Sequence, residues 1–263
     1  MRKFFLFLCL FIGLIGLNYA GFNYDRSEMK IYLNNEGGAH IVEKITLRID
    51  DEIASKVYDE NMAITNDITS WKMRTGISDI KYHVNTNNVK ILNLRVTPQP
   101  KIRLSLINPS YEGVLELEYD VTGISDVQLI RARTYQHIFK KQALSFTSSD
   151  EKKLVLDENR HLYIYIPDNS IISSIDPKPQ NIDVLNSETK EFYWRGKTIL
   201  EDFSLIYINE ISMKDEVELY FKDTLNNLFS FINSEGGYYL GIMIGILLVT
   251  YFIIKSKIPS QTK

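Results

Sequence analysis

An uncharged apolar run near the C-terminus constrains this chain more than any other feature. Residues 236–254 read GGYYLGIMIGILLVTYFII and carry no charged side chain. As a helix, a run of this length covers about 28 Å at a rise of about 1.5 Å per residue. The hydrocarbon core of a bilayer is about 30 Å thick. We therefore expect a single transmembrane helix over residues 236–254.

The residues on either side of this run predict its orientation. Tyr238 lies near one end, where amphipathic rings prefer the headgroup level. Lys255 and Lys257 follow the run, whereas Glu235 precedes it. Positive residues remain on the cytoplasmic side of membrane proteins. We expect the tail 255–263 to be cytoplasmic and the bulk of the chain to lie outside the cell membrane.

Three glycines inside the run are spaced four residues apart. Gly237, Gly241 and Gly245 form two overlapping small-xxx-small steps on one helix face. Such a face lets two helix backbones approach closely, which predicts a helix–helix contact and a possible homodimer. Glycine is also frequent in membrane helices in general, so a plain anchor is the alternative.

The N-terminus has the pattern of a secretory signal over residues 1–20. Arg2 and Lys3 form the charged start, and an apolar stretch shorter than a membrane span follows. Cleavage is expected after Ala20. Because Asn18 occupies a position where a small residue is preferred, an uncleaved signal-anchor is the alternative.

Both interpretations place residues 21–235 outside the membrane. Cys9 is the only cysteine and lies in the signal, so we expect no disulfide in this region. No Asn-x-Ser/Thr site has a residue other than proline at x. The two features together indicate a bacterial or archaeal surface. The net charge of −3 does not favour a nucleic-acid partner.

Period-two alternation of apolar residues predicts many β-strands in this region. A glycine-containing insert at 34–38 separates the first two and predicts a hairpin. Three more strands, over 89–97, 101–107 and 114–121, are separated by PQP and NPSYEG, which predict turns. Further strands are expected at 127–132, 134–139, 143–147, 153–156, 161–166, 191–195 and 203–209.

Two segments have a helical pattern. Asp67 is typical of a helix N-cap and Gly76 of a helix end, which predicts one short helix between them, while the rest of 51–76 is irregular. From residue 213 to 233 apolar residues recur at 3.6 residues per turn, which predicts an amphipathic helix. The alternative lets EVELYF, residues 216–221, finish the sheet, with helix only after it.

These patterns define a mainly β fold with five parts. We expect a signal peptide over 1–20 and an antiparallel, immunoglobulin-like β-sandwich ectodomain over 21–211, either as one body or as two β subdomains. A juxtamembrane amphipathic helix follows over 212–235, and then the transmembrane helix and the tail.

The sequence contains no catalytic signature. It lacks G-x-S-x-G, H-E-x-x-H, a Walker A loop and a strand-linked G-x-G-x-x-G. His161 has Asp157 and Glu158 close by in the chain, which permits a metal or acid–base role, but a solvated turn is the ordinary case. The acidic run 50–52 lacks calcium-loop spacing. We therefore predict no catalytic, cofactor or metal site.

Two stretches resemble known surface proteins. YLNNEGGAHIVEKITLRI, residues 32–49, resembles the first hairpin of uncharacterised archaeal and bacterial surface proteins. LYIYIPDNSIISSIDPKPQ, residues 162–180, is similar to a strand and a proline-rich exit in the same kind of protein. The resemblance implies a signal, a β ectodomain and one C-terminal span, and it implies no activity.

The function expected from these features is binding. We predict a membrane-anchored scaffold, adhesion or accessory subunit that contacts the bilayer and a protein or envelope polymer. The 16 tyrosines suit exposed recognition surfaces as well as sheet packing. The alternatives are an exported hydrolase with an unfamiliar site and a sensor ectodomain that works through a membrane partner.

Overall fold

The computed structural model describes residues 21–64, 66–146, 154–181, 189–210, 212–233 and Tyr239. These residues belong to two compact units divided after Glu210, and the strands lie in the first, called unit 1 here. Within the described residues, no helix has the length and apolarity needed to cross a bilayer. The predicted signal over 1–20 and the glycines at 237, 241 and 245 of the predicted span lie outside those residues.

Unit 1 contains the following elements in chain order: β1 (Phe22–Leu33), β2 (Ala39–Ile49), α2 (Glu52–Ile64), α3 (Ile68–Thr75), β3 (Lys90–Arg103), β4 (Tyr111–Thr122), β5 (Ser125–Arg131), β6 (Thr134–Phe139), η1 (Lys141–Ala143), β7 (Val155–Leu156), β8 (Arg160–Tyr165), β9 (Ser170–Asp176), β10 (Glu191–Arg195), β11 (Thr198–Ile199) and β12 (Ser204–Glu210). The prediction of a mainly β fold is confirmed.

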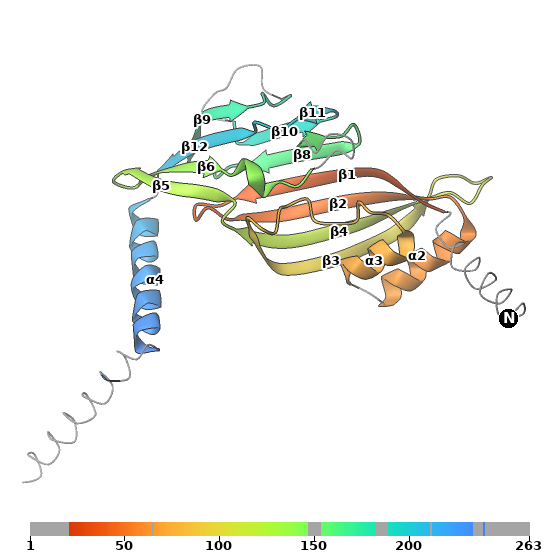
Figure 1. Ribbon diagram of the computed structural model, residues 1–263, viewed down its shortest axis with the longest axis horizontal. Helices are drawn as coiled ribbons and strands as arrows, with labels where there is room; N and C mark the ends of the chain where they lie inside the picture. Colours follow the sequence, from red (N-terminus) through yellow and green to blue (C-terminus); the bar gives the residue numbers. More distant parts are fainter. Residues whose placement is uncertain are drawn as a thin grey trace, which may run out of the picture. The chain divides into compact units, whose positions relative to one another are not determined.

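The largest sheet has six strands in the order β10-β8-β1-β2-β4-β3 (Figure 1). A second sheet has the order β5-β6-β12-β9, and β7 pairs with β11 in a third. All pairs are antiparallel except β1 with β8, which run parallel with Ser27 opposite Arg160. The large sheet is therefore mixed, and the expectation of a purely antiparallel arrangement was wrong at this pair.

The hairpin of β1 and β2 confirms the turn predicted at 34–38. The side-chain oxygen of Asn34 accepts hydrogen bonds from the backbone N–H groups of Glu36 and Gly38, each at 2.9 Å. Gly37 has a φ of +78°, a region that glycine enters without steric cost. The turn fixes the register, so that Ile31 lies opposite Ile41 with both side chains buried.

Strand β3 corrects one prediction. The PQP segment at 98–100 is not a turn, because β3 continues through it as one strand from Lys90 to Arg103. β3 is an edge strand that pairs only with β4, so the prolines cost no ladder hydrogen bond on its open side. Register shifts between Gln99 and Ile102 accommodate the irregularity. The strand expected over 101–107 correspondingly ends at Arg103.

The region 51–76 is more helical than predicted. Helix α3 lies between the predicted cap and stop: the Asp67 carboxylate accepts from the N–H groups of Thr69 and Ser70, and Gly76 is left-handed. Helix α2 was missed. Asp51, which belongs to the acidic run 50–52, caps α2 by accepting from the N–H of Ala54 at 2.6 Å.

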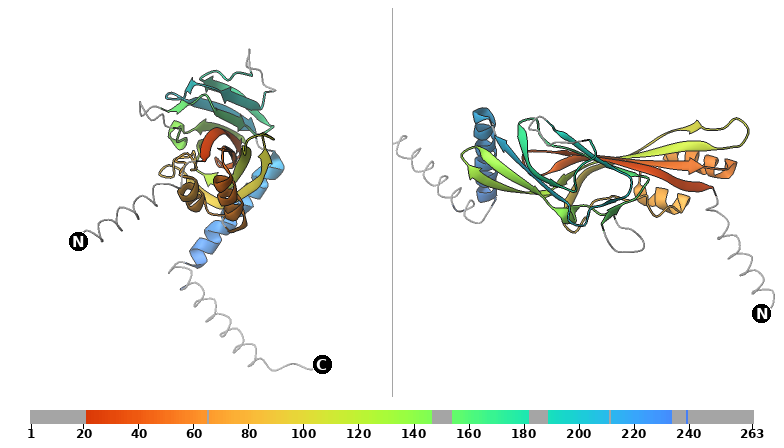
Figure 2. Two further views of the ribbon diagram at one scale, coloured as in Figure 1. Left: turned by 90° about the vertical axis from the view of Figure 1, so that its right-hand side faces the viewer. Right: turned by 90° about the horizontal axis from the view of Figure 1, so that it is seen from above.

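The core lies between the inner face of the six-stranded sheet and the elements that cover it. Helices α2 and α3 lie against β2, β4 and β3 (Figure 2). Tyr58 of α2 is fully buried and its ring meets Trp71 of α3 edge-on at 5.2 Å between centroids. At the other end, Trp194 of β10 meets Phe203, just before β12, in the same geometry at 5.4 Å. These aromatic contacts join the sheets and helices of unit 1 into one core.

Most of the later strand predictions are confirmed, with shifts of one or two residues: β5, β6, β8, β10 and β12 occupy the expected segments. The strand expected over 143–147 was wrong within the residues described. Its start belongs to the 3-10 turn η1, and only Leu144 forms an isolated bridge, to Val84.

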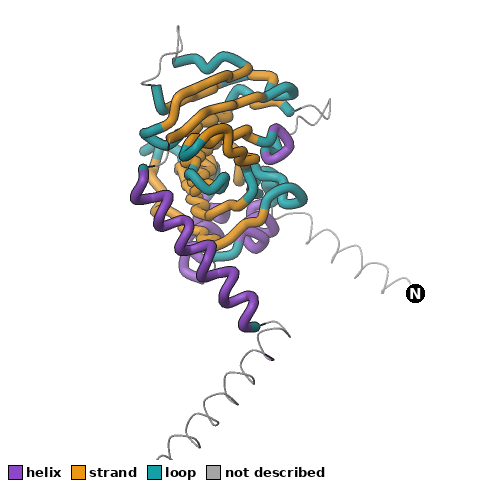
Figure 3. Tube along the Cα trace, turned by 90° about the vertical axis from the view of Figure 1, so that its left-hand side faces the viewer, coloured by secondary structure: helices purple, strands orange, loops and turns teal. Residues whose placement is uncertain are grey.

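The residues expected to form the amphipathic helix are helical in the second unit. Helix α4 spans Met213–Ile232 as one continuous helix (Figure 3), so EVELYF does not extend the sheet. Val217, Phe221, Leu225 and Phe229 recur every four residues along it and are about half exposed or more, at 49%, 61%, 49% and 60%. They form the apolar stripe that the periodicity predicted.

Candidate functional site

The residues that the sequence offered for a catalytic or metal site do not lie together in the structure. Among the described residues, no group of three histidine, cysteine, aspartate or glutamate side chains is arranged to hold a metal ion. Asp157 pairs with Arg160 at 3.7 Å, whereas His161, the next residue, points to the opposite face of the sheet. Asp50 accepts from Arg48 at 2.8 Å in an ordinary surface pair.

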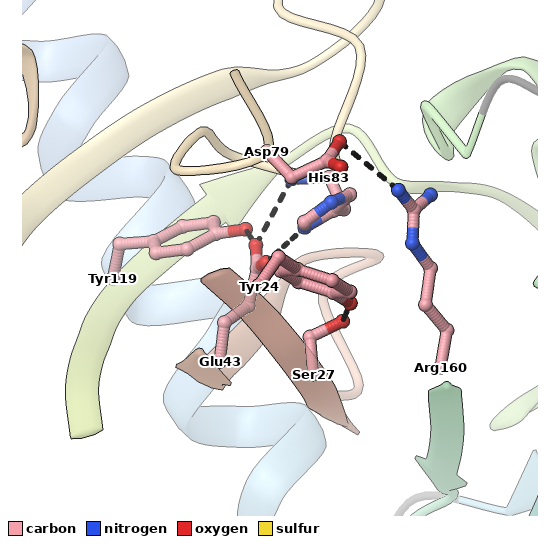
Figure 4. A network of polar contacts seen from close by, with 7 residues as sticks. All are labelled: Tyr24, Ser27, Glu43, Asp79, His83, Tyr119 and Arg160. Atoms are coloured by element: carbon pink, nitrogen blue, oxygen red, sulfur yellow. Dashed lines mark hydrogen bonds and ion pairs between the residues drawn. The ribbon is translucent and has the colours of Figure 1, made fainter. Parts of the chain in front are cut away.

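A polar cluster that sequence reasoning missed lies inside the core (Figure 4). Glu43 projects from β2 into the core with a relative exposure of 1%. Its carboxylate accepts from Nδ1 of His83 at 2.6 Å, from the backbone N–H of His83 at 3.1 Å, and from the hydroxyl of Tyr119. Burial, and next the Glu43 charge, raise the pKa of Tyr119 well above its usual value, so this phenol remains a donor.

A second pair of contacts lies beside this cluster. Arg160, at the start of β8, is 4% exposed and donates to Asp79 at 3.1 Å. The Tyr24 hydroxyl donates to Ser27 at 2.7 Å. Figure 4 places both contacts next to the Glu43–His83 pair. Together these contacts join β2, β4 and β8 to the loop that follows α3, while the Tyr24–Ser27 bond lies within β1.

The geometry of this cluster indicates a structural role. Three donors surround the carboxylate, as a buried charge requires. Glu43 and His83 are each about 1% exposed, so a molecule in solvent cannot touch either side chain. The alternation of side chains along β2 could have identified Glu43 as a buried residue. Ile41, Glu43 and Ile45 are two residues apart and therefore lie on one side of the strand.

The outer face of the six-stranded sheet is the candidate functional site. Alternation along each strand places one set of side chains in the core and the other set on this face. Three cross-strand rows, read from β10 to β3, are Arg195, His161, Glu28, Lys44, Glu116, Thr97; then Tyr193, Tyr163, Lys30, Val42, Glu118, Arg95; then Glu191, Tyr165, Tyr32, His40, Asp120, Leu92.

The half of this face formed by β10, β8 and β1 is aromatic. The rings of Tyr32 and Tyr165 stack at 4.6 Å with an interplanar angle of 11°. The rings of Tyr163 and Tyr193 lie 5.7 Å apart. We call these four residues the tyrosine patch. The pattern in HLYIYI could have predicted its centre, because Leu162 and Ile164 point inward and place Tyr163 and Tyr165 on the outer face, where neighbouring side chains leave Tyr163 8% exposed.

The other half, formed by β2, β4 and β3, is charged and paired. Lys44 bonds Glu116 at 3.2 Å, and His40 donates to Asp120 at 2.9 Å. The pKa of Asp120 is lowered by hydrogen bonds, first from Asn93 and then from His40. A shallow hollow of about 330 Å³ lies here, lined by His40, Asn93, Leu94, Arg95, Glu118, Tyr119 and Asp120.

A second hollow, of about 370 Å³, adjoins the tyrosine patch. It is lined by Arg26, Glu28, Lys44, Thr46, Val114, His161, Tyr163 and Arg195. The pKa of His161 is lowered, first by burial and then by the Arg195 charge, so its imidazole is neutral at neutral pH. The pKa of Tyr165 is raised, first by burial and then by Glu191, so its phenol is neutral as well.

The edge strands of this sheet are poor sites for further strand pairing. On β10, the side-chain amide of Gln180 donates to the carbonyl of Arg195 at 2.6 Å and accepts from its N–H at 3.2 Å. Asn181 contacts Glu191 and Tyr193 in the same way, at 2.8 and 3.2 Å. On β3, prolines and register shifts interrupt the open edge. A partner of this sheet therefore has its outer face available rather than its edges.

Comparisons with known proteins give no family. No protein-family model matches the chain. No curated protein matches it either. Two solved structures of an M1 zinc metallopeptidase from Deinococcus radiodurans, the second a mutant bound to a Tyr-Ser-Ala substrate, are similar at 11% and 10% identity. In each case 71% of this chain and 42% of the peptidase chain are covered, with TM-scores of 0.28 and 0.27. Scores this low establish neither a shared fold nor a shared activity.

Proposed function

We propose that this chain is a single-pass, membrane-anchored surface protein whose unit 1 is a binding module. Unit 1 would lie outside the cell as an immunoglobulin-like sandwich, held by the apolar run 236–254, with the tail 255–263 in the cytoplasm. The apolar stripe of α4, directly before that run, supports a juxtamembrane position. The module acts as an adhesion, scaffold or accessory subunit rather than as an enzyme.

The observation that carries this proposal is the tyrosine patch on a sheet whose edges are poor sites for strand pairing. Tyr32 is 39% exposed on the solvent side of the sheet. Tyrosine and arginine are enriched in the cores of protein interfaces. Tyrosine buries much area there with few rotatable bonds. The stacked pair of Tyr32 and Tyr165 is already ordered, which lowers the entropy that binding must overcome. A protein partner contacts the outer face at this patch.

Photo-crosslinking in intact cells tests the proposal. A benzoylphenylalanine residue replaces Tyr32 in one variant and, as a matched control, Leu129 on β5 in another; Leu129 is 63% exposed on the other large sheet. We expect a discrete crosslinked adduct from position 32 and none from position 129. Equal labelling from both positions, or none from either, would overturn the binding role of this face.

Protease treatment of intact cells tests the topology independently. Addition of protease outside the cell should remove unit 1 and spare the C-terminal tail, which an epitope tag after Lys263 reports. Protection of unit 1 in intact cells, with cleavage only after permeabilisation, would contradict the proposed location.

A further inference from the structure

Arg195 is a cation on the outer face that is held in place without a carboxylate partner among the residues that the structure describes. Its Nε and one terminal nitrogen donate to the hydroxyl of Tyr163, at 3.1 and 2.8 Å. Its guanidinium carbon lies 4.6 Å from the ring centre of Tyr193. Within the described chain, no carboxylate oxygen comes within ion-pair distance of this guanidinium. Of its five N–H donors, three remain for a ligand.

The hollow of about 370 Å³ beside Arg195 has a positive balance. Three cations line it, Arg26, Lys44 and Arg195, against the single carboxylate of Glu28. The Glu28 carboxylate is already engaged by Lys30 at 3.0 Å.

The other two cations of the hollow differ from Arg195. Arg26 bonds Glu112 at 3.3 Å, and Lys44 bonds Glu116 at 3.2 Å. Arg195 is thus the cation of the hollow that forms no ion pair with a described carboxylate, and Glu28 acts on it only through a weaker charge interaction. An incoming anion meets it without displacing an existing partner.

We propose that this hollow binds a carboxylate side chain from an acidic segment of a protein partner, with Arg195 as the principal donor. The planar fork of arginine matches two carboxylate oxygens, and such bidentate pairs are among the stronger hydrogen bonds. Stacking on Tyr193 and the bonds to Tyr163 hold the side chain in place, so little rotamer entropy is lost on binding. This inference rests on the proposed function, since the hollow adjoins the tyrosine patch.

A peptide titration tests the proposal with the full-length chain in detergent micelles at low ionic strength. The probe is a fluorescent hexaglutamate peptide with blocked termini, followed by thermophoresis, with hexaglutamine as the neutral control. Arg195→Gln should weaken hexaglutamate binding about tenfold, the loss expected for hydrogen bonds to a charged group. Arg195→Lys should restore part of the binding, because it keeps the charge but not the fork. Arg131→Gln, an exposed arginine on β5, should leave binding unchanged.

Each contrary outcome is decisive. Hexaglutamate binding no tighter than hexaglutamine, or binding that survives Arg195→Gln, overturns the proposal. A poly(glycerol phosphate) probe that binds more tightly than hexaglutamate overturns it in favour of an anionic envelope polymer. Crosslinking from position 32 reports the proposed function separately. An adduct there without peptide binding removes the carboxylate site alone, whereas peptide binding without an adduct removes the partner interface and leaves only an anion-binding hollow.

Discussion

The Nδ1 atom of His83 lies 2.6 Å from Oε2 of Glu43, across 40 residues of sequence and with both side chains buried. This bond joins the middle of β2 to the loop after α3. Because Tyr119 of β4 donates to the same carboxylate, three chain segments share one buried acceptor. The stability of the core therefore depends on a charge at a position where neighbouring inward residues are apolar.

Removing that acceptor should destabilise unit 1 strongly. Glu43→Leu leaves the His83 ring N–H, the His83 backbone N–H and the Tyr119 hydroxyl without a partner, which should lower the free energy of unfolding by about 3 kcal/mol or more. Urea denaturation of the full-length chain in micelles measures the change. Glu116→Leu on the outer face of β4 is the control, with an expected loss under about 1 kcal/mol. Equal losses would contradict the structural role of Glu43.

Gly113 should tolerate no side chain. A Cβ atom on Gly113 would fall 2.5 Å from Cε2 of Tyr58. The ring cannot retreat easily, because its hydroxyl donates to the Gln99 carbonyl at 2.7 Å and its face is closed by Trp71. Gly113→Ala should cost about 1–3 kcal/mol of unfolding free energy. The same substitution should cost less in a Tyr58→Leu background, and an unchanged cost there would exclude the predicted clash.

The capped edge of β10 should keep the chain from associating with itself. Replacing Gln180 and Asn181 by alanine frees backbone groups of Glu191, Tyr193 and Arg195. Unpaired strand edges recruit other strands, so sedimentation should show concentration-dependent association beyond that of the wild type. Asn169→Ala, which removes a similar amide bond to Glu210 at the end of β12, an inner strand of the other sheet, serves as the control.

Stability should fall as the pH drops below about 6.5, in part because of His137. This side chain is fully buried, and burial lowers its pKa. The unfolded chain then takes up a proton at a higher pH than the folded chain. This contribution to stability is therefore complete above pH 6.5 and declines as the pH falls toward the lower folded pKa, by at most about 1.4 kcal/mol per pH unit.

Denaturation at pH 7.5 and 5.5 measures this effect. His137→Phe should shrink the loss of stability between the two values, because it removes the titrating group while keeping a ring against Tyr207, which stacks on His137 at 4.6 Å. Tyr207→Phe, which alters the same stack without removing the imidazole, should retain the wild-type loss. An unchanged loss in His137→Phe would rule out this source of acid sensitivity.

Local signals in the sequence predicted local structure well. The cap at Asp67 and the left-handed stop at Gly76 bound α3 as expected, and alternation located most strands. The missed helix α2 begins after Asp51 with a weakly apolar sequence, and tertiary contacts such as those of Tyr58 hold it in place. PQP has the composition of a turn, but an edge strand tolerates it.

Nonlocal relationships could not be predicted from one chain. Nothing near Ser27 in sequence indicates a parallel partner at Arg160. The tyrosine patch joins residues from β1, β8 and β10, so it exists only once those strands are neighbours. The alternation of side chains predicts that each tyrosine lies on the outer side of its own strand. Only the order of the strands in the sheet brings the tyrosines together. The same holds for Arg195 and Tyr163, which meet across the β8–β10 pair.

The parallel pairing of β1 with β8 also has a consequence for folding during synthesis. The chain emerges N-terminus first, and β1 can pair at once with β2 through its tight hairpin. Its other side must wait until β8 has been made, long after β2 and β4 are complete. During that interval one side of β1 has unpaired backbone groups, and an intermediate with such an open strand is exposed to misassembly.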